Sequence, residues 1–265
     1  MDFDLAELVE QVVLISRLAG CEILKIYDSD FEIETKADDS PLTAADRAAH
    51  ELITQALGEL TPEIPVWSEE SAAIPYAERA AWPRFWLVDP LDGTKEFIKR
   101  NGEFTVNIAL VSTHEPILGV VHVPVQNREY FGYQGGGAFL SEEATKPRSI
   151  SVSHRADKTV RVVGSRSHLG SSLEKYLKNL GPHVMVPMGS SLKFCLVASG
   201  EADIYPRLGP TSEWDTAAAQ AVVECAGGKV VTLQGQRLLY NTKADVLNPH
   251  FLVFGDGSRH WTDYI

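Results

Sequence analysis

The sequence contains few cysteines, few basic residues and no long apolar run. Its three cysteines, Cys21, Cys195 and Cys225, lie far apart and lack metal-ligand spacing. This argues against a disulfide scaffold or a zinc site and favours reduced thiols in a cytoplasmic protein. No apolar stretch approaches the ~20 residues of a membrane-spanning helix. The acidic start, Met1 to Asp4, is unlike a secretory signal, whereas peripheral contact with a membrane stays open.

The shortage of basic residues also limits the partners. Lys and Arg number 24 against 36 Asp and Glu, so the formal net charge is −12. No basic stripe is present to neutralise a phosphate backbone, and a nucleic-acid polymer is not expected as a partner. A small phosphorylated substrate is compatible with this charge, because bound cations would offset carboxylates at a metal site.

The 265 residues, 44% of them hydrophobic, suffice for one large domain or for two halves that share a core. The sequence turns polar at 141–147, where we place the boundary between an N-terminal α+β half, 1–147, and a C-terminal α/β half, 148–265. A monomer and a homodimer are both compatible with the sequence.

Hydrophobic periodicity predicts the main elements of each half. In the first half it predicts helices at 4–27 and 43–60 and strands at 31–35, 85–89, 104–112, 117–123 and 129–133. In the second half strands are expected at 160–163, 184–187, 203–205, 229–232 and 251–254, and helices at 172–180, 192–199 and 214–226. Such alternation is typical of a layered α/β fold.

The segment from Phe85 to Phe97 is the one around which the chain is organised. An apolar strand should end at Asp89, because Pro90 follows. Asp89 and Asp92 then leave one tight turn together with the Leu91 carbonyl and the Thr94 hydroxyl. These are the oxygen ligands that Mg²⁺ prefers. A solvated turn is the alternative for this segment taken alone.

Two further acidic clusters favour the metal site. Glu69 follows the short apolar segment 64–67, and Asp215 is expected in the first turn of the helix at 214–226. The Glu-Glu pair at 69–70, the Asp-Pro-Leu-Asp-Gly-Thr segment at 89–94 and the Trp-Asp-Thr-Ala-Ala segment at 214–218 occur in this order. Together they resemble the signatures of the inositol monophosphatase superfamily, which consists of magnesium-dependent, lithium-sensitive phosphatases.

The resemblance implies an alternating α/β/α/β/α sandwich with two or three Mg²⁺ ions between the halves. One ion would take Glu69, Asp89, the Leu91 carbonyl and Thr94, and another would take Asp89, Asp92 and Asp215. Asp46 and Thr94 would orient and deprotonate the attacking water, and the amides of Gly93 and Thr94 would hold phosphate oxygens. Asp46 also has capping-box spacing from Thr43, which gives it a purely structural alternative.

Substrate choice must lie outside the shared metal site. The segment Asp-Gly-Thr-Lys-Glu-Phe at 92–97 resembles the 3′(2′),5′-bisphosphate nucleotidases of the CysQ type, in which the 3′-phosphate of 3′-phosphoadenosine 5′-phosphate (PAP) is removed to give AMP during sulfur metabolism. PAPS is a further candidate substrate. The residues expected to contact the nucleotide lie in three later segments: Ser165, His168, Ser190, Lys193 and Arg207. Each has a structural alternative as a helix cap or an exposed loop residue.

Three other functions remain alternatives. Glu213, two residues before Asp215, resembles a glutamate of the inositol phosphatases, so hydrolysis of inositol phosphates or of fructose 1,6-bisphosphate is the nearest alternative. A non-catalytic sensor that binds Mg²⁺ and nucleotide is the second. A simple cation-binding structural protein is the third, and it would need neither the Ser-Arg-Ser-His segment at 165–168 nor Lys193.

Overall fold

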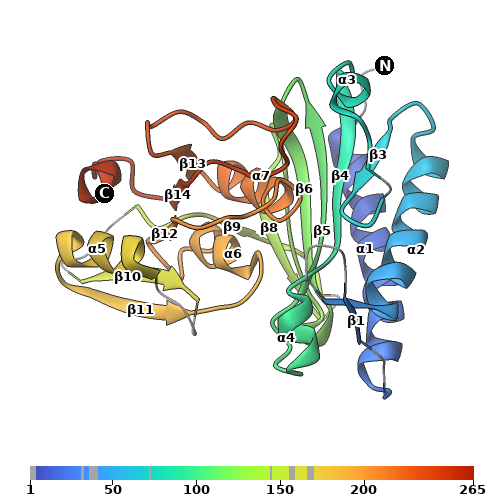
Figure 1. Cartoon of the computed structure of the whole chain (residues 1–265), viewed down its shortest axis with the longest axis horizontal. Helices are drawn as coiled ribbons and strands as arrows, with labels where there is room; N and C mark the ends of the chain where they lie inside the picture. The colour runs from blue at the N-terminus through green and yellow to red at the C-terminus, as the bar shows by residue number, and fades with distance from the viewer. Residues whose placement is uncertain are drawn as a thin grey trace.

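A computed structural model describes residues 4–30, 33–35, 41–71, 73–143, 145–154, 159–165 and 170–265. Its helices and sheets stack in five alternating layers (Figure 1). Helices α1 and α2 form one outer layer, a seven-stranded sheet the next, and α6 and α7 the middle. A five-stranded sheet follows, and α5 forms the other outer layer. The α/β/α/β/α sandwich expected from the sequence is therefore confirmed.

The seven-stranded sheet has the order β3-β4-β5-β6-β7-β8-β9 and is antiparallel except for the β3–β4 pair. Its strands are β3 (Val66–Ser68), β4 (Arg84–Asp92), β5 (Thr105–Ser112), β6 (Glu115–Val123), β7 (Arg128–Tyr133), β8 (Gly137–Glu142) and β9 (Arg148–Ile150). Side chains alternate between its faces, so Trp86 and Val88 pack toward α1 and α2. Phe85 and Leu87 pack on the opposite face, toward α6 and α7.

Helices α1 (Leu5–Tyr27) and α2 (Ala44–Leu60) cover the first of these faces. Helix α2 begins with the predicted capping box, in which Thr43 and Asp46 bond reciprocally. Helix α1 is also pinned by a polar cluster: Arg17 bonds the buried carboxylate of Glu129 at 2.9 Å, and His122 Nδ1 lies 3.2 Å from the same carboxylate.

The middle layer joins the two sheets through one continuous apolar core. Helices α6 (Leu192–Ala198) and α7 (Ala217–Cys225) are buried along almost their whole length. Close packing of α7 on β6 depends on Gly119, because a Cβ there would lie 2.1 Å from the Ala218 carbonyl oxygen. The start of α7 is thereby held against the seven-stranded sheet.

The five-stranded sheet has the order β11-β10-β12-β14-β13. Its strands are β10 (Val160–Gly164), β11 (His183–Pro187), β12 (Ile204–Arg207), β13 (Lys229–Thr232) and β14 (Phe251–Phe254). Its outer face packs on α5 (Gly170–Leu180) and the 3₁₀ helix η2 (Trp261–Tyr264). The remaining elements are β1 (Ile33–Thr35) paired with β2 (Pro41–Thr43), α3 (Tyr76–Arg79), α4 (Thr94–Ile98) and η1 (Pro124–Gln126). In the described ranges, no helix combines the length and apolarity needed to cross a bilayer.

Most predicted elements are present, although β2, β3, α3 and α4 were not predicted, and three other differences occur. Strand β4 does not end at Asp89 but continues to Asp92. Strand β3 pairs with β4 only as far as Val88, so the N–H that Pro90 lacks is not needed for pairing with β3. Helix α7 begins at Ala217 rather than at 214, so Asp215 lies in the turn before it. Strands β8 and β9 were not predicted. The boundary between halves near residue 147 stays a prediction.

Candidate metal and phosphate site

A bulge in β4 brings Asp89 and Asp92 to the same face of the sheet. Residues three apart in a regular strand point to opposite faces. Here Asp89 pairs with Asn107, and Asp92 pairs with Thr105, so β4 advances three residues while β5 advances two. The extra residue turns Asp92 to the face of Asp89 and leaves Leu91 in the core against α1 and α2. Both carboxylates therefore face the middle layer.

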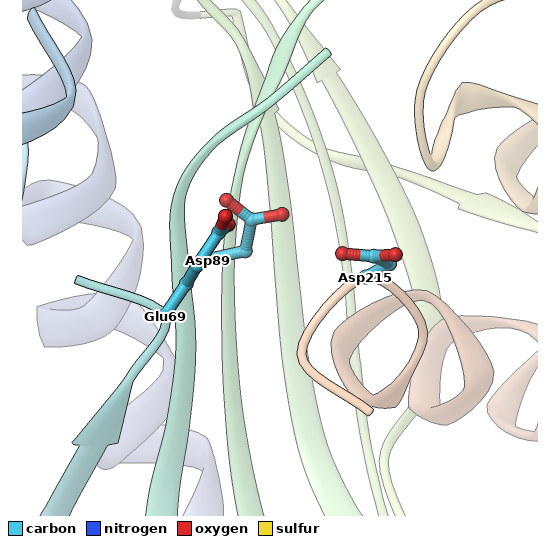
Figure 2. Close-up of side chains that lie close together, drawn as sticks. All are labelled: Glu69, Asp89 and Asp215. Carbon is cyan, nitrogen blue, oxygen red and sulfur yellow. The ribbon is translucent and has the colours of Figure 1, made fainter. Parts of the chain in front are cut away.

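Two other segments bring carboxylates to Asp89. Strand β3 runs parallel to β4, and the Glu69 amide donates to the Val88 carbonyl at 3.0 Å, which places Glu69 beside Asp89. Asp215 comes from the turn before α7, where its Oδ2 accepts a hydrogen bond from the Ser212 amide at 3.0 Å. Figure 2 shows Glu69 and Asp89 on one side and Asp215 opposite them.

The three carboxylates can share a cation. One oxygen from each of Glu69, Asp89 and Asp215 lies within 4.8 Å of the others. Burial, together with the charges of Glu69, Asp92 and Asp215, raises the pKa of Asp89 well above its ordinary value. Burial and the charge of Asp92 also raise the pKa of Asp215 to about 8. Such crowding is unfavourable unless a cation is bound, and hard oxygen donors fit a divalent ion such as Mg²⁺.

The turn after Asp92 contacts α2 through Thr94 and Asp46. Thr94 Oγ1 donates to Asp46 Oδ1 at 3.3 Å, and Asp46 Oδ2 accepts from the amide and the hydroxyl of Thr43 at 2.8 and 2.7 Å. Gly93 precedes Thr94 with φ +94°, and a Cβ there would lie 3.2 Å from the Glu103 carbonyl oxygen. The turn therefore requires glycine at this position.

Basic groups approach the carboxylates from the C-terminal half. Asp92 and Asp215 line a small cavity of about 50 Å³ together with Ser190, Lys193 and Arg207. Burial lowers the pKa of Lys193 to about 8, while the charge of Asp92 opposes this shift. The buried Nε of Arg207 has no hydrogen-bond partner among the described residues. The cavity thus combines carboxylates for a cation with donors for an anion.

A second cavity adjoins the first. It has about 290 Å³, lies beside the small cavity with Tyr205 and Arg207 lining both, and includes the exposed Ser165 in its lining. His168, expected near the nucleotide, lies outside the described residues.

The comparisons with known proteins agree with this arrangement. Residues 4–256 match the model of the inositol monophosphatase family. The chain belongs to that family. It is also 50% identical to the 3′(2′),5′-bisphosphate nucleotidase CysQ of Salmonella typhimurium and to that of Escherichia coli K12, over 93% of this chain and 99% of each relative.

Solved structures of the family show the same fold. The crystal structure of CysQ from Bacteroides thetaiotaomicron is 42% identical, with a TM-score of 0.83 over 94% of this chain and 97% of that chain. An inositol monophosphatase from Anabaena is 22% identical, with a TM-score of 0.79 over 99% of this chain and 96% of that chain. The latter supports the fold alone. The family is metal-dependent, and the acidic cluster provides a place for the ion.

Two predicted residues have contacts that the sequence did not indicate. Glu213 is buried, and its Oε2 accepts a hydrogen bond from the Asn241 amide at 2.7 Å, so it holds the loop behind Asp215. Ser190 is not the N-cap residue of α6, which is Ser191, but its hydroxyl accepts a hydrogen bond from the Leu192 amide at 3.4 Å. Ser191 was missed by sequence reasoning although it adjoins Ser190, and its amide donates to Asp92 Oδ2.

Proposed function

We propose that this protein is a Mg²⁺-dependent phosphatase that removes the 3′-phosphate of a 3′,5′-bisphosphate nucleotide, with PAP as substrate and AMP and phosphate as products. The observation that carries the proposal is the small cavity in which Asp92 and Asp215 face Lys193 and Arg207. A metal-held phosphate would lie against the carboxylates, and a second anionic group would bind beside Lys193 and Arg207. The names of the relatives at 50% identity support the same substrate class.

Glu69, Asp89, Asp92, Asp215 and the Leu91 carbonyl would hold the ions, two or three per site. When bound, Mg²⁺ would supply Lewis acidity toward the phosphoryl group and the attacking water. The amides of Gly93 and Thr94 would donate to phosphoryl oxygens.

Asp46 and Thr94 would orient the water and accept its proton. The Thr94 hydroxyl oxygen lies 3.3 Å from Asp46 Oδ1 and 3.4 Å from the Leu91 carbonyl oxygen. When the hydroxyl donates to Asp46, its lone pairs can accept from water, and the proton can pass on to the carboxylate. The two hydrogen bonds from Thr43 hold the Asp46 side chain in place. The capping box thus serves this proposed role as well as the helix start.

Lys193, Arg207 and Ser190 would bind the second phosphate, and the larger cavity near Ser165 would take the nucleoside. An inositol monophosphate lacks a group to fill both cavities, which disfavours that alternative. The cytoplasmic location expected from the cysteines is part of this proposal.

The test is phosphate release from PAP, PAPS, 3′-AMP, inositol 1-phosphate and fructose 1,6-bisphosphate, with Mg²⁺, with EDTA, and with added Li⁺. We expect the highest kcat/KM for PAP, no activity in EDTA and inhibition by Li⁺. Equal rates with inositol 1-phosphate would refute the substrate, and full activity in EDTA would refute the metal mechanism. The sensor alternative predicts binding without release.

Variants of Lys193 and Arg207 distinguish binding of the second phosphate from binding of the phosphate that is removed. Lys193→Ala and Arg207→Ala should each raise KM for PAP by roughly 10–100-fold, since a buried charge-assisted contact contributes about 1.5–3 kcal/mol. Their effect on 3′-AMP, which lacks the 5′-phosphate, should be much smaller. Lys229→Ala, at an exposed lysine of β13, is the matched control and should behave as wild type.

A further inference from the structure

Asn107 is a buried amide that lies directly beside the carboxylate cluster. It belongs to β5, is 1% exposed and pairs with Asp89 of β4. Directly opposed residues of antiparallel strands have Cβ atoms about 4.5–5.5 Å apart on the same face. The Asn107 side chain therefore lies next to the Asp89 side chain, on the face that points to the middle layer.

The orientation of this amide follows from its hydrogen bonds. Ser191 Oγ donates to Asn107 Oδ1 at 2.8 Å. Thr105 Oγ1 lies 2.8 Å from Ser191 Oγ, and because Ser191 has given its only hydroxyl proton to Asn107, Thr105 must be the donor. The chain of donors thus runs from Thr105 through Ser191 to Asn107. The oxygen of the Asn107 amide faces Ser191, so its NH₂ group is not used in this chain.

The Asn107 Nδ2 atom has no hydrogen-bond partner within the described part of the chain. A buried donor without a partner is costly, and such groups in native proteins usually serve a purpose. An NH₂ group only donates, so its partner must be an acceptor. The strand pairing places the Asp89 carboxylate beside this amide as an acceptor, and Oδ1 of that carboxylate also accepts a hydrogen bond from the Leu91 amide at 3.0 Å.

Ser191 also connects this amide to the other acidic residue of the bulge. The Ser191 amide donates to Asp92 Oδ2, while its hydroxyl donates to Asn107. Ser191 is the N-cap residue of α6, and Lys193 is the second residue of that helix. The start of α6, and with it Lys193, is therefore tied to Asp92 and to Asn107 through one residue.

We propose that Asn107 is a positioning residue: its Nδ2 donates to Asp89 when that carboxylate holds a cation, and Ser191 transmits this arrangement to α6. Cation binding and nucleotide binding would then reinforce each other. The inference rests on the proposed function for its nucleotide part, whereas its metal part requires only the acidic cluster. Partners that orient ligating carboxylates commonly change metal affinity 10–100-fold.

The test measures binding without turnover. Mg²⁺ affinity is determined by calorimetry on the full chain, and the affinity for AMP, the expected product, is determined with and without Mg²⁺. Asn107→Leu should weaken Mg²⁺ binding by about 10–100-fold. Ser191→Ala should remove most of the factor by which Mg²⁺ raises AMP affinity. Tyr176→Phe is the control, because it removes a buried hydrogen bond to Trp261 far from the site and should change neither affinity.

Unchanged Mg²⁺ affinity in folded Asn107→Leu would overturn the positioning role. If Asn107→Leu does not fold, Ser191→Ala decides, and wild-type values for both Mg²⁺ binding and its coupling to AMP would overturn the proposal. A wild-type protein that binds Mg²⁺ but not AMP would refute the nucleotide function, and the Mg²⁺ measurement would still decide on Asn107.

Discussion

Replacing Asp89 with asparagine should stabilise the metal-free protein and abolish its stabilisation by Mg²⁺. Carboxylate oxygens of Glu69, Asp89 and Asp215 lie within 4.8 Å of one another. At an effective dielectric constant of about 20, two unit charges at this separation repel by roughly 3.5 kcal/mol. A carboxyl that takes up a proton instead costs about 1.4 kcal/mol for each pH unit above its unfolded pKa. By either route, Asp89 destabilises the metal-free fold at neutral pH.

The asparagine variant removes this cost while keeping the local structure. Its side-chain oxygen can still accept the hydrogen bond from the Leu91 amide. After relaxation, we expect the free energy of unfolding to rise by about 1–3 kcal/mol, which corresponds to a rise in Tm of roughly 3–8 °C for a chain of this size. Mg²⁺ at about 1,000 times its Kd should stabilise the wild type by about 4.1 kcal/mol, but the variant hardly at all. The order of stability should therefore reverse when Mg²⁺ is added.

Urea and thermal unfolding in EDTA and in excess MgCl₂ measure both effects. Asp203→Asn is the matched control, because Asp203 is equally buried but accepts hydrogen bonds from the amide and the guanidinium of Arg161. It should lose about 1–3 kcal/mol in both conditions and keep the full gain from Mg²⁺. If Asp89→Asn were less stable than the wild type in EDTA, or gained as much from Mg²⁺, the metal centre would be wrong.

Three further predictions concern the stability of the fold and the turn at Gly93. Burial alone would raise the pKa of Glu129, but its two basic neighbours lower it from 4.5 to about 2. Its contribution to stability should be complete above pH 4.5 and disappear toward pH 2, so the deficit of Glu129→Gln in urea unfolding should shrink over that range. Arg79→Leu should cost about 2–4 kcal/mol in urea unfolding, because Arg79 is buried and hydrogen-bonded to the 241–244 loop, with kcat of the folded enzyme unchanged. Gly93→Ala should cost about 1–2 kcal/mol and also lower kcat. Gly181→Ala, with φ +85° and open space, should affect unfolding alone.

Local features of the fold were predictable from the sequence because neighbouring residues determine them. The capping box of Thr43 and Asp46 is formed as its spacing indicates. The continuous apolar run from Phe85 to Val88 does form a strand, with successive side chains buried on opposite faces of the sheet. Strand β8 was missed because it begins at the last of three successive glycines and polar residues follow it, so its pairing with β7 depends on the hairpin and not on its own pattern.

The candidate site was predictable in its acidic residues but not in the groups around them. Carboxylates at the boundaries of apolar elements identified Glu69, Asp89 and Asp215 as candidates, and the structure does bring these three together. Nothing in the sequence near Asn107 distinguishes it from any other polar residue in a strand. Its contact with Ser191, 84 residues away, arises only when α6 packs on the seven-stranded sheet.

The spacing of the two aspartates in Asp-Pro-Leu-Asp has a geometric reason. A regular strand would bring residues two apart, not three apart, to the same face. The two aspartates, three residues apart, share a face only because β4 bulges between them, opposite Asn107 and Thr105. Pro90 fits this segment, since a bulge releases the backbone donor that proline lacks. The two acidic side chains and the two polar ones opposite them thus form a single surface, on which the start of α6 rests through Ser191.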